Sequence, residues 1–464
     1  MDTQKIKKYP RLVAALIETF GFGPALASAI ALFLVLVAIA AAIWVVRSAP
    51  PRTLVLTSGP EGSTFQRFAA SYQKQLATHG VTLEVRASDG SLDNLKRLQT
   101  SASDVDVGFV QGGLGKDADL SGLVSLGSIA YQPLWVFYRS ATPHTRLSEL
   151  SGLRIAVGAT GSGTRSLALA LLAANGITGP PTTFLELDAD AAATALIDGK
   201  IDAVFSMGDS ASLQTLRSLV RASGVQIFNF SQADAYVRHF SYLNKMVLPE
   251  GSIDLGKNLP AQDVQLIGPT VELVARKGLN PALSDLLLEA AQEVHGKAGL
   301  LQRRGEFPAP LEHEFKISED AQRYYKSGRS FLYRMIPSFW IANLLNRVLV
   351  AIVPLILVFI PALRLFPVLY RWSVQSRIYR HYRPLLRLER EAYGPLTRAR
   401  VQELLQQVDE IERMTNRVKV PAAYANQFYE LRGHLAFVRR RLEAAVPVEE
   451  VKGAEEKPEG GAGR

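Results

Sequence analysis

Two long apolar segments without charged residues constrain this chain more than any other feature. Residues 24–46 are 23 consecutive positions without a charge. As a helix they span about 34 Å at about 1.5 Å per residue, enough to cross a bilayer. A second uncharged run, residues 348–363, gains length from residues 341–345 and contains Pro354 and Pro361, and membrane helices tolerate proline. We therefore predict membrane spans at residues 24–46 and 341–363.

Basic residues flank both spans on the same side. Those before the first span and those after the second are Lys5, Lys7, Lys8 and Arg11, then Arg364, Arg371, Arg377, Arg380, Arg383 and Arg387. Because Lys and Arg collect in cytoplasmic segments, we predict that both termini are cytoplasmic and that the region between the spans is exported. A cleaved signal peptide is the alternative, but its apolar core should be about 7–15 residues long. The small-residue run Ala38-Ile39-Ala40 lies inside the longer segment, so we expect an uncleaved anchor.

The composition excludes several classes of protein. The chain has no cysteine, which rules out a disulfide framework, a thiolate nucleophile and a cysteine zinc site. The formal net charge of +9 indicates nucleic-acid binding only where basic residues form a folded patch. Here they concentrate beside apolar segments, and the aromatic and basic residues at 370–383 are typical of a membrane interface. We expect the lipid bilayer, and no nucleic acid, as their partner.

The exported region repeats one pattern. Strand candidates centre near Val55, Val85 and Val107, and again about a hundred residues later near Ala156, Leu185 and Val204. Helix candidates at residues 65–77 and 166–175 follow the first strand of each set, which is the order of a parallel α/β sheet. We predict two α/β lobes within residues 50–330. The first lobe takes about 50–145 and 246–330, and the second about 146–245.

Glycine-rich turns at residues 59–64 and 158–165 open the first helix of each set. Backbone N–H groups and the helix dipole converge at such turns and favour an anion, and ligands lie at the carboxyl ends of the strands. We therefore expect a small anionic solute, a carboxylate or an amino acid, between the lobes. The candidate ligand-binding residues are Ser58, Gly62, Ser63, Thr64, Ser88, Gln111, Tyr131, Gly161, Ser162, Gly163, Thr164, Arg165, Met207 and Asp209.

Three of these candidates have a specific expected role. The guanidinium of Arg165 can bind a carboxylate through two parallel hydrogen bonds, and its alternative is a surface arginine at a helix start. Gln111 offers an amide that both donates and accepts, and its alternative is an ordinary loop residue. Asp209, or else Asp89, is a possible partner for an ammonium group. For both glycine turns the alternative is tight strand-to-helix geometry without a ligand.

The chemistry of the known hydrolase motifs is missing. Thr164-Arg165 replaces the Lys-Ser/Thr that ends a nucleotide-binding P-loop, and without that lysine the phosphates lose their main partner. The sequence contains neither a G-x-S-x-G elbow nor an H-E-x-x-H helix,. We therefore expect a binding protein, not an enzyme, with no cofactor and no metal.

The region after the second span has a pattern of its own. Apolar residues recur at helical spacing in two runs: Val401, Leu404, Leu405, Val408, Ile411 and Met414, then Phe428, Leu431, Leu435, Val438 and Leu442. Two such runs joined near residues 419–421 predict a cytoplasmic helical hairpin within residues 371–446. Residues 447–464 are rich in Glu, Lys and Gly, a composition typical of disorder.

Several motifs together resemble the TAXI family of TRAP-transporter solute-binding subunits, in its membrane-anchored branch. They are residues 58–62 (Ser-Gly-Pro-Glu-Gly), 107–113, 133–138, 161–165, 172–176, 305–308 and 325–328. The resemblance covers about residues 50–390. It implies a type II periplasmic-binding fold of two lobes that close on a small, usually carboxylated solute. It also implies delivery to a TRAP permease in a bacterial inner membrane, with the binding domain in the periplasm.

The chain departs from that family in two ways. Family members are often soluble or lipid-tethered, whereas this chain has a predicted span at each end of its binding region, at residues 24–46 and 341–363. The hairpin has no role in simple delivery. Both features raise a second hypothesis, in which the chain is a membrane-tethered sensor or interaction scaffold that signals to the hairpin.

Overall fold

The computed structural model describes residues 9–20, 24–115, 118–329, 331–336, 338–380, 382–394, 396–416 and 425–444. Most of the basic N-terminus, the hairpin junction at 419–421 and the C-terminal tail at 447–464 lie outside the described residues. The chain divides into two compact units, Ser48–Asn346 and a second formed by Met1–Arg47 with Arg347–Arg464.

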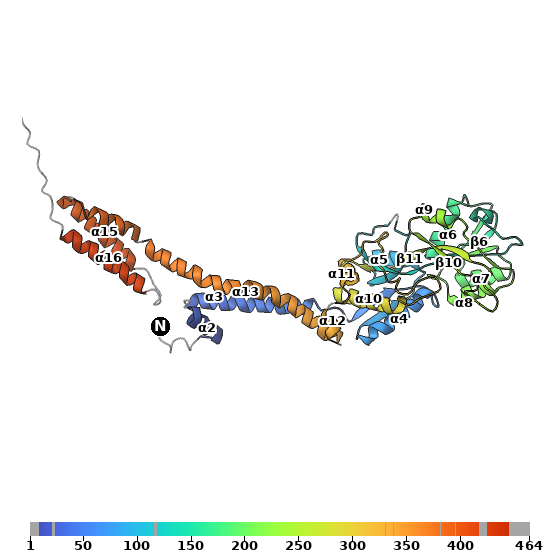
Figure 1. The fold of residues 1–464 in the computed structure, drawn as a ribbon, viewed down its shortest axis with the longest axis horizontal. Helices are drawn as coiled ribbons and strands as arrows, with labels where there is room; N and C mark the ends of the chain where they lie inside the picture. The colour runs from blue at the N-terminus through green and yellow to red at the C-terminus, as the bar shows by residue number, and fades with distance from the viewer. Residues whose placement is uncertain are drawn as a thin grey trace, which may run out of the picture. The chain divides into compact units, whose positions relative to one another are not determined.

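The Ser48–Asn346 unit contains two β-sheets, and we call each sheet with its helices a lobe (Figure 1). The sheet of the first lobe has the order β10-β11-β3-β1-β2, and β4 pairs with β11 as well. Strands β1, β2 and β3 run parallel, and β11 pairs antiparallel with β3, β4 and β10. Its strands are β1 (Thr53–Thr57), β2 (Thr82–Arg86), β3 (Val107–Gln111), β4 (Leu123–Tyr131), β10 (Leu243–Leu248) and β11 (Val264–Arg276).

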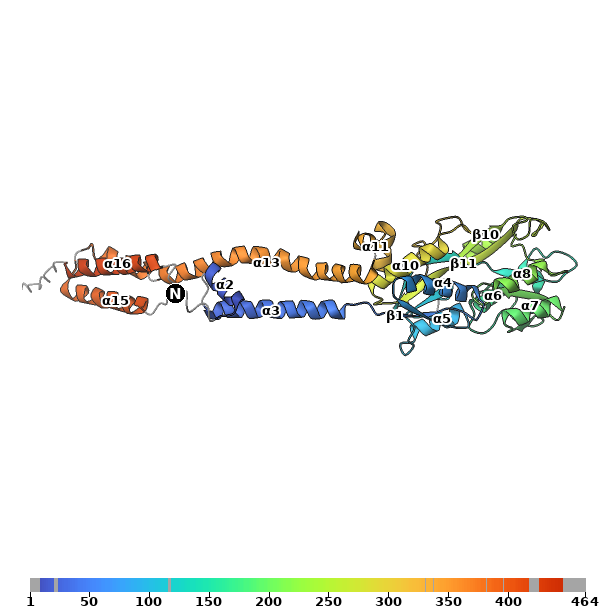
Figure 2. The ribbon, with the colours of Figure 1, turned by 90° about the horizontal axis from the view of Figure 1, so that it is seen from below.

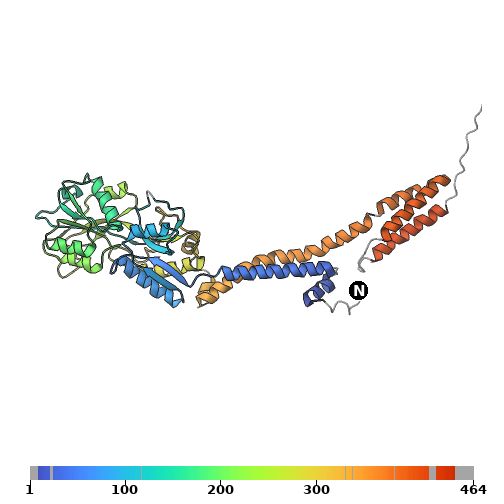
Figure 3. The same ribbon diagram turned by 180° about the vertical axis from the view of Figure 1, so that it is seen from behind.

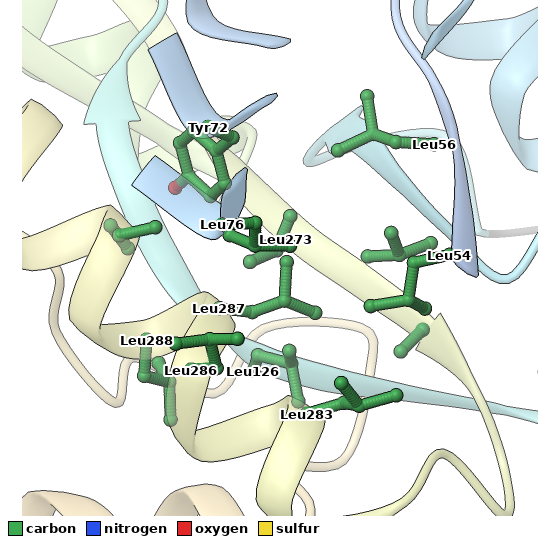
Figure 4. Close-up of a cluster of buried hydrophobic side chains, with 14 of the residues drawn as sticks. Leu54, Leu56, Tyr72, Leu76, Leu126, Leu273, Leu283, Leu286, Leu287 and Leu288 are labelled. Atoms are coloured by element: carbon green, nitrogen blue, oxygen red, sulfur yellow. The ribbon is translucent and has the colours of Figure 1, made fainter. Parts of the chain in front are cut away.

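Helices cover both faces of this first sheet. Helices α4 (Thr64–Thr78) and α10 (Pro281–His295) lie side by side on one face (Figure 2). Figure 4 shows their core, where Leu76 and Leu287 meet Leu273 of β11. Helix α5 (Ser91–Gln99) covers the other face through Leu95 and Leu98. Alternate residues of each strand thus point to opposite faces, and α11 (Glu319–Ser327) packs beside α10.

The sheet of the second lobe has the order β7-β6-β8-β5-β9. Helix α6 (Gly163–Ala174) packs on one face, while α7 (Ala189–Ile197) and α8 (Leu213–Arg221) pack on the other. The strands are β5 (Trp135–Tyr138), β6 (Arg154–Ala156), β7 (Thr183–Leu185), β8 (Ala203–Ser206) and β9 (Gln226–Ile227). The helices are η1 (Leu147–Leu150, a 3-10 turn), α6 (Gly163–Ala174), α7 (Ala189–Ile197), α8 (Leu213–Arg221) and α9 (Ala233–His239).

The chain passes between the lobes twice, from β4 to β5 and from β9 to β10. The six predicted strand centres all lie in strands, and the two predicted helices correspond to α4 and α6. The first crossing differs from the expectation of a boundary near residue 145, because β5 pairs with β8 and β9 in the second sheet. Its four residues, Trp135–Tyr138, are all buried there.

Both apolar segments form helices. Helix α3 is Pro24–Arg47, and α13 runs from Phe339 to Tyr379. By length and composition, Pro24–Arg47 and Phe339–Pro361 could each cross a membrane. Within its own unit, α2 (Arg11–Phe20) folds against the start of α3 through Leu16, Ile17 and Ala27 (Figure 3).

The helices after α13 form a small packed core. Helices α15 (Arg398–Asn416) and α16 (Ala425–Glu443) correspond to the two predicted runs, and they pack along each other (red in Figure 3). A third helix, α14 (Tyr382–Glu391), packs against both through Leu385 and Leu388. The core is therefore three-helical, because α14 also carries an apolar face. A short helix, α12 (Phe331–Met335), precedes α13.

Candidate functional site

Both glycine turns lead into helix N-termini, as the sequence predicted. Ser63 caps α4 by accepting a hydrogen bond from the Gln66 N–H at 3.2 Å, and Ser162 caps α6 by accepting one from the Arg165 N–H at 3.1 Å. A serine cap satisfies one of the free N–H groups in the first turn of a helix. Gly161 has a φ of 87°, a backbone conformation that glycine adopts without strain.

The two lobes contact each other directly at these turns. The Thr64 N–H donates to the Gly208 carbonyl at 3.1 Å, and the Asp93 N–H donates to the Gly161 carbonyl at 3.0 Å. The Gln111 amide also donates, through Nε2, to the carbonyl of Gly163 at 3.0 Å. The carboxyl ends of β1, β3, β6 and β8 therefore meet across the boundary between the lobes.

The N-terminus of α6 is filled by a carboxylate of the chain itself. Oδ2 of Asp209 accepts hydrogen bonds from the N–H groups of Gly163 (2.6 Å) and Thr164 (3.4 Å). Oδ1 accepts from the hydroxyls of Thr164 (2.8 Å) and Ser210 (3.1 Å). Oδ2 also lies against Gly90 of the other lobe, where an added Cβ would stand 2.8 Å from it. Asp209 thus occupies the position where the sequence predicted an anionic solute.

Asp209 is completely buried. Burial raises the pKa of its carboxyl above the ordinary value, while the hydrogen bonds from Thr164, Gly163 and Ser210 work in the opposite direction. A buried charge is tolerated where hydrogen bonds satisfy its oxygens. Here the donors belong to the second lobe, and the carboxylate contacts the first lobe at Gly90.

Arg165 is engaged elsewhere. Its Nη2 lies 2.6 Å from Oε1 of Glu186, in the same lobe. Glu186 also accepts from the Thr160 hydroxyl at 2.6 Å, and the hydrogen bond from Thr160, followed by the charge of Arg165, lowers the pKa of Glu186. The guanidinium therefore pairs with a carboxylate of the protein through Nη2, while its buried Nη1 has no hydrogen-bond partner among the described residues.

Two cavities lie between the lobes, on either side of these contacts. The first, of about 280 Å³, is lined by Thr164 and by carboxylates of both lobes. Its polar lining includes Glu61, Asp89, Asp188, Asp190 and Ser206. The second, of about 300 Å³, is more apolar and is lined by Thr64, Tyr131, Trp135 and Leu301, among others. The hydroxyl of Tyr131 donates to Glu306 at 2.8 Å, and its burial raises the pKa of Tyr131 to about 12.

The predicted site residues thus separate into three groups. Thr164 faces the first cavity, and Thr64 and Tyr131 face the second. Gln111, Gly161, Ser162, Gly163 and Asp209 form the contact between the lobes.

The remaining predicted residues serve the local structure. The Ser58 hydroxyl donates to the Arg86 carbonyl at 3.2 Å, the Gly62 N–H donates to Gln66 at 2.6 Å, and Ser88 accepts from the Gly90 N–H at 3.3 Å. Met207 is completely buried in the apolar core of the second lobe.

Sequence reasoning left some cavity residues out of the candidate set. Asp188 and Ser206 stand at the ends of β7 and β8, so the strand-end rule reaches them. Asp190 lies two residues further, in α7, and no motif marks it. Gln132 follows the strand predicted at residues 123–130, so the strand-end rule reaches it as well; its amide, with oxygen and nitrogen exchanged, accepts from the N–H groups of Gly208 and Asp209 at 3.2 and 2.6 Å.

Several solved structures are similar to this chain, all at low sequence identity. None of the curated proteins matches the chain in sequence. Similar solved structures include an ancestral arginine-binding protein bound to arginine, with 15% identity, 53% of this chain and 93% of that chain covered, and a TM-score of 0.34. The periplasmic aliphatic sulphonate binding protein of Escherichia coli has 16% identity, covers 64% and 84%, and has a TM-score of 0.33. A histidine kinase sensor domain similar to periplasmic binding proteins has 14% identity, covers 52% and 90%, and has a TM-score of 0.34.

The family of the chain follows from a sequence model. The two lobes, joined by two crossings, form a periplasmic-binding-protein-like α/β fold. Residues 62–294, which include the contact between the lobes and most of the residues that line the two cavities, match the model of the NMT1-like family. With half of its length matched, the chain belongs to the NMT1-like family.

Proposed function

We propose that this chain is a membrane-anchored extracytoplasmic solute-binding protein, which captures a small solute between its lobes by hinge closure. The observation that carries the proposal is the first cavity, because residues of both lobes line it. A cavity of about 280 Å³ suits a solute about the size of an amino acid. The two crossings supply a hinge, because a small number of connecting residues is enough to absorb the rotation of two rigid lobes.

The two apolar helices support the anchoring. They lie at residues 24–47 and 339–361, before and after the two-lobed region in sequence. With the basic residues at both ends, they favour cytoplasmic termini and a periplasmic binding domain. The resemblance to TAXI subunits makes a TRAP permease the proposed recipient of the solute, and no catalytic step is proposed.

The three-helix core of α14, α15 and α16 favours a second candidate function. A helical core on the cytoplasmic side is not needed for delivery, so the chain would instead report solute binding across the membrane. Deleting residues 391–464 separates the two functions. Uptake persists after the deletion if the chain delivers solute, and only a downstream response is lost if it signals.

A thermal-unfolding screen of the full-length protein in nanodiscs tests the proposal. The panel holds amino acids, dicarboxylates, oxo-acids, sulfonates and amines. A solute that binds the folded state raises the melting temperature by mass action, so we expect a shift with one chemical class. A flat response to every class contradicts the proposed function.

A further inference from the structure

We propose that the first cavity recognises a cationic group, an ammonium or guanidinium of a small solute, and not a carboxylate. This inference rests on the proposed solute-binding function and names the class of solute for that site. It reverses the charge that the glycine turns predicted.

The charge of the cavity wall is the first argument. Glu61 and Asp89 come from the first lobe, and Asp188 and Asp190 from the second. Among the described residues that line the cavity, none is a lysine, arginine or histidine. The ion pairs of the described residues also include none of these four carboxylates. The four carboxylates are exposed and have no ion-pair partner among the described residues, although Asp188 and Asp190 accept hydrogen bonds within their own lobe. A cation entering the cavity would be attracted by them, and an anion would be repelled.

Two helix N-termini at the cleft, those of α6 and α7, are the second argument, because carboxylates of the chain already occupy them. Asp209 fills the N-terminus of α6. Asp188 caps α7 by accepting from the N–H groups of Asp190 and Ala191 at 3.1 and 2.8 Å. The positive ends of these dipoles are thus neutralised before any solute arrives. A solute carboxylate would have to displace Asp209 from a buried site with at least four hydrogen bonds.

A buried hydroxyl without a partner is the third, independent argument. Ser206 ends β8 and lines the first cavity, and it is only 3% exposed. Its Oγ has no hydrogen-bond partner among the described residues. Leaving a buried polar atom unpaired is costly, and a polar group of the solute would satisfy this hydroxyl, which can donate or accept. Asp188 and Asp190 line the same cavity, and an amine is the group that both the serine oxygen and these carboxylates would accept.

The experiment compares charge classes on the full-length protein. Binding of putrescine, agmatine and ethanolamine is measured by calorimetry beside that of succinate, acetate and taurine. Asp89→Asn removes one cavity charge without breaking a described side-chain hydrogen bond. Asp198→Asn is the matched control, an exposed aspartate outside the cavity. We expect at least one amine to bind, and Asp89→Asn to weaken it about tenfold, with Asp198→Asn within twofold of the wild type.

The alternatives separate this inference from the proposed function. Binding of succinate, acetate or taurine with no amine bound overturns the cationic assignment and leaves the solute-binding function standing. Binding of no class overturns both. An amine whose affinity is equal in the wild type and in Asp89→Asn overturns the cavity assignment. If Asp89→Asn unfolds, Glu61→Gln with Glu293→Gln as its exposed control makes the same comparison.

Discussion

The carboxylate of Asp209 accepts a hydrogen bond from the backbone N–H of Gly163 at 2.6 Å, so the first residue of α6 binds an anion from the chain itself. An unoccupied helix N-terminus can bind an external anion. Here the same oxygen also lies against Gly90 of the other lobe, where an added Cβ would stand 2.8 Å from it. The same carboxylate therefore satisfies a helix and contacts the other lobe.

Removing the charge of Asp209 should destabilise the protein. In Asp209→Asn the side chain keeps its shape, but its NH₂ group cannot accept a hydrogen bond and its neutral oxygen is a weaker acceptor for the donors of Gly163, Thr164 and Ser210. We expect the free energy of unfolding to fall by about 2–3 kcal/mol, as for lost hydrogen bonds to a buried charge. Urea unfolding followed by tryptophan fluorescence measures it. Ser210→Ala, which removes one donor to the same carboxylate, should cost about 1 kcal/mol. Equal stability of Asp209→Asn and the wild type would contradict the stabilising role of this carboxylate.

A methyl group on Gly163 should disrupt the contact between the lobes. A Cβ there would lie 2.1 Å from Oε1 of Gln111, and Gln111 is itself buried. We expect Gly163→Ala to lower solute affinity at least about tenfold, because closure is opposed by overpacking worth about 1–3 kcal/mol. Gly179→Ala is the control, since a Cβ there meets nothing within 4 Å. If Gly163→Ala binds the solute with the affinity of the wild type, the contact at Gly163 is not needed for closure of the lobes.

Arg165→Ala should have little effect. Its guanidinium pairs with Glu186, whose side chain is 51% exposed, and exposed pairs contribute about 0.2–1 kcal/mol. We expect solute affinity to change less than about threefold. The hypothesis of an anion-gripping arginine predicts instead a loss of about 2–5 kcal/mol of binding free energy. Calorimetry on the purified variant distinguishes the two, and a loss of that size would restore Arg165 to the site.

Stability should fall as the pH rises from 6.5 to 8. Glu272 of β11 is completely buried, and burial raises the pKa of its carboxyl to about 8 from an ordinary 4.5. Between these values the folded state holds a proton that the unfolded chain has released. The free energy of unfolding therefore falls with pH, by about 1.4 kcal/mol per pH unit at most.

Between pH 4.5 and 6.5, the loss of stability caused by Glu272 is offset by His295. Burial lowers the pKa of His295 to about 3 from an ordinary 6.5, so below pH 6.5 the unfolded state binds the extra proton and stability rises with pH. Thermal unfolding from pH 6.5 to 8 isolates Glu272. Glu272→Gln should flatten the decline, while the exposed Glu84→Gln should keep it. If the stability of Glu272→Gln still falls from pH 6.5 to 8, another titrating group causes the fall.

The strands and the two-lobed arrangement could be predicted because they depend on local patterns. Runs such as Thr53–Thr57 and Ala203–Ser206 are short, apolar and followed by turns with glycine or serine. The same order of strand, turn and helix occurs in both lobes. The glycine turns also placed the start of α4 to within one residue, at Thr64, whereas α6 begins at Gly163, three residues before the predicted start.

The chemistry of the site could not be read from such patterns. Asp209 lies 46 positions from Gly163, and nothing in either segment shows that one fills the other. The same holds for Arg165 and Glu186, which meet only because β6 and β7 are neighbours in the sheet. An anion site and an occupied anion site have the same sequence signature. Only the fold shows which carboxylates surround the cavity.

Solute binding should move the two lobes toward each other, and the distance between one label on each lobe tests this directly. Because the chain has no cysteine, Lys74→Cys on α4 and Arg217→Cys on α8 place one spin label on each lobe, both at exposed positions. Double electron–electron resonance is recorded in nanodiscs, with and without a solute that raises the melting temperature. We expect the solute to narrow the distance distribution and to increase its shorter component. An identical distribution with and without saturating solute would contradict hinge closure as the means of capture.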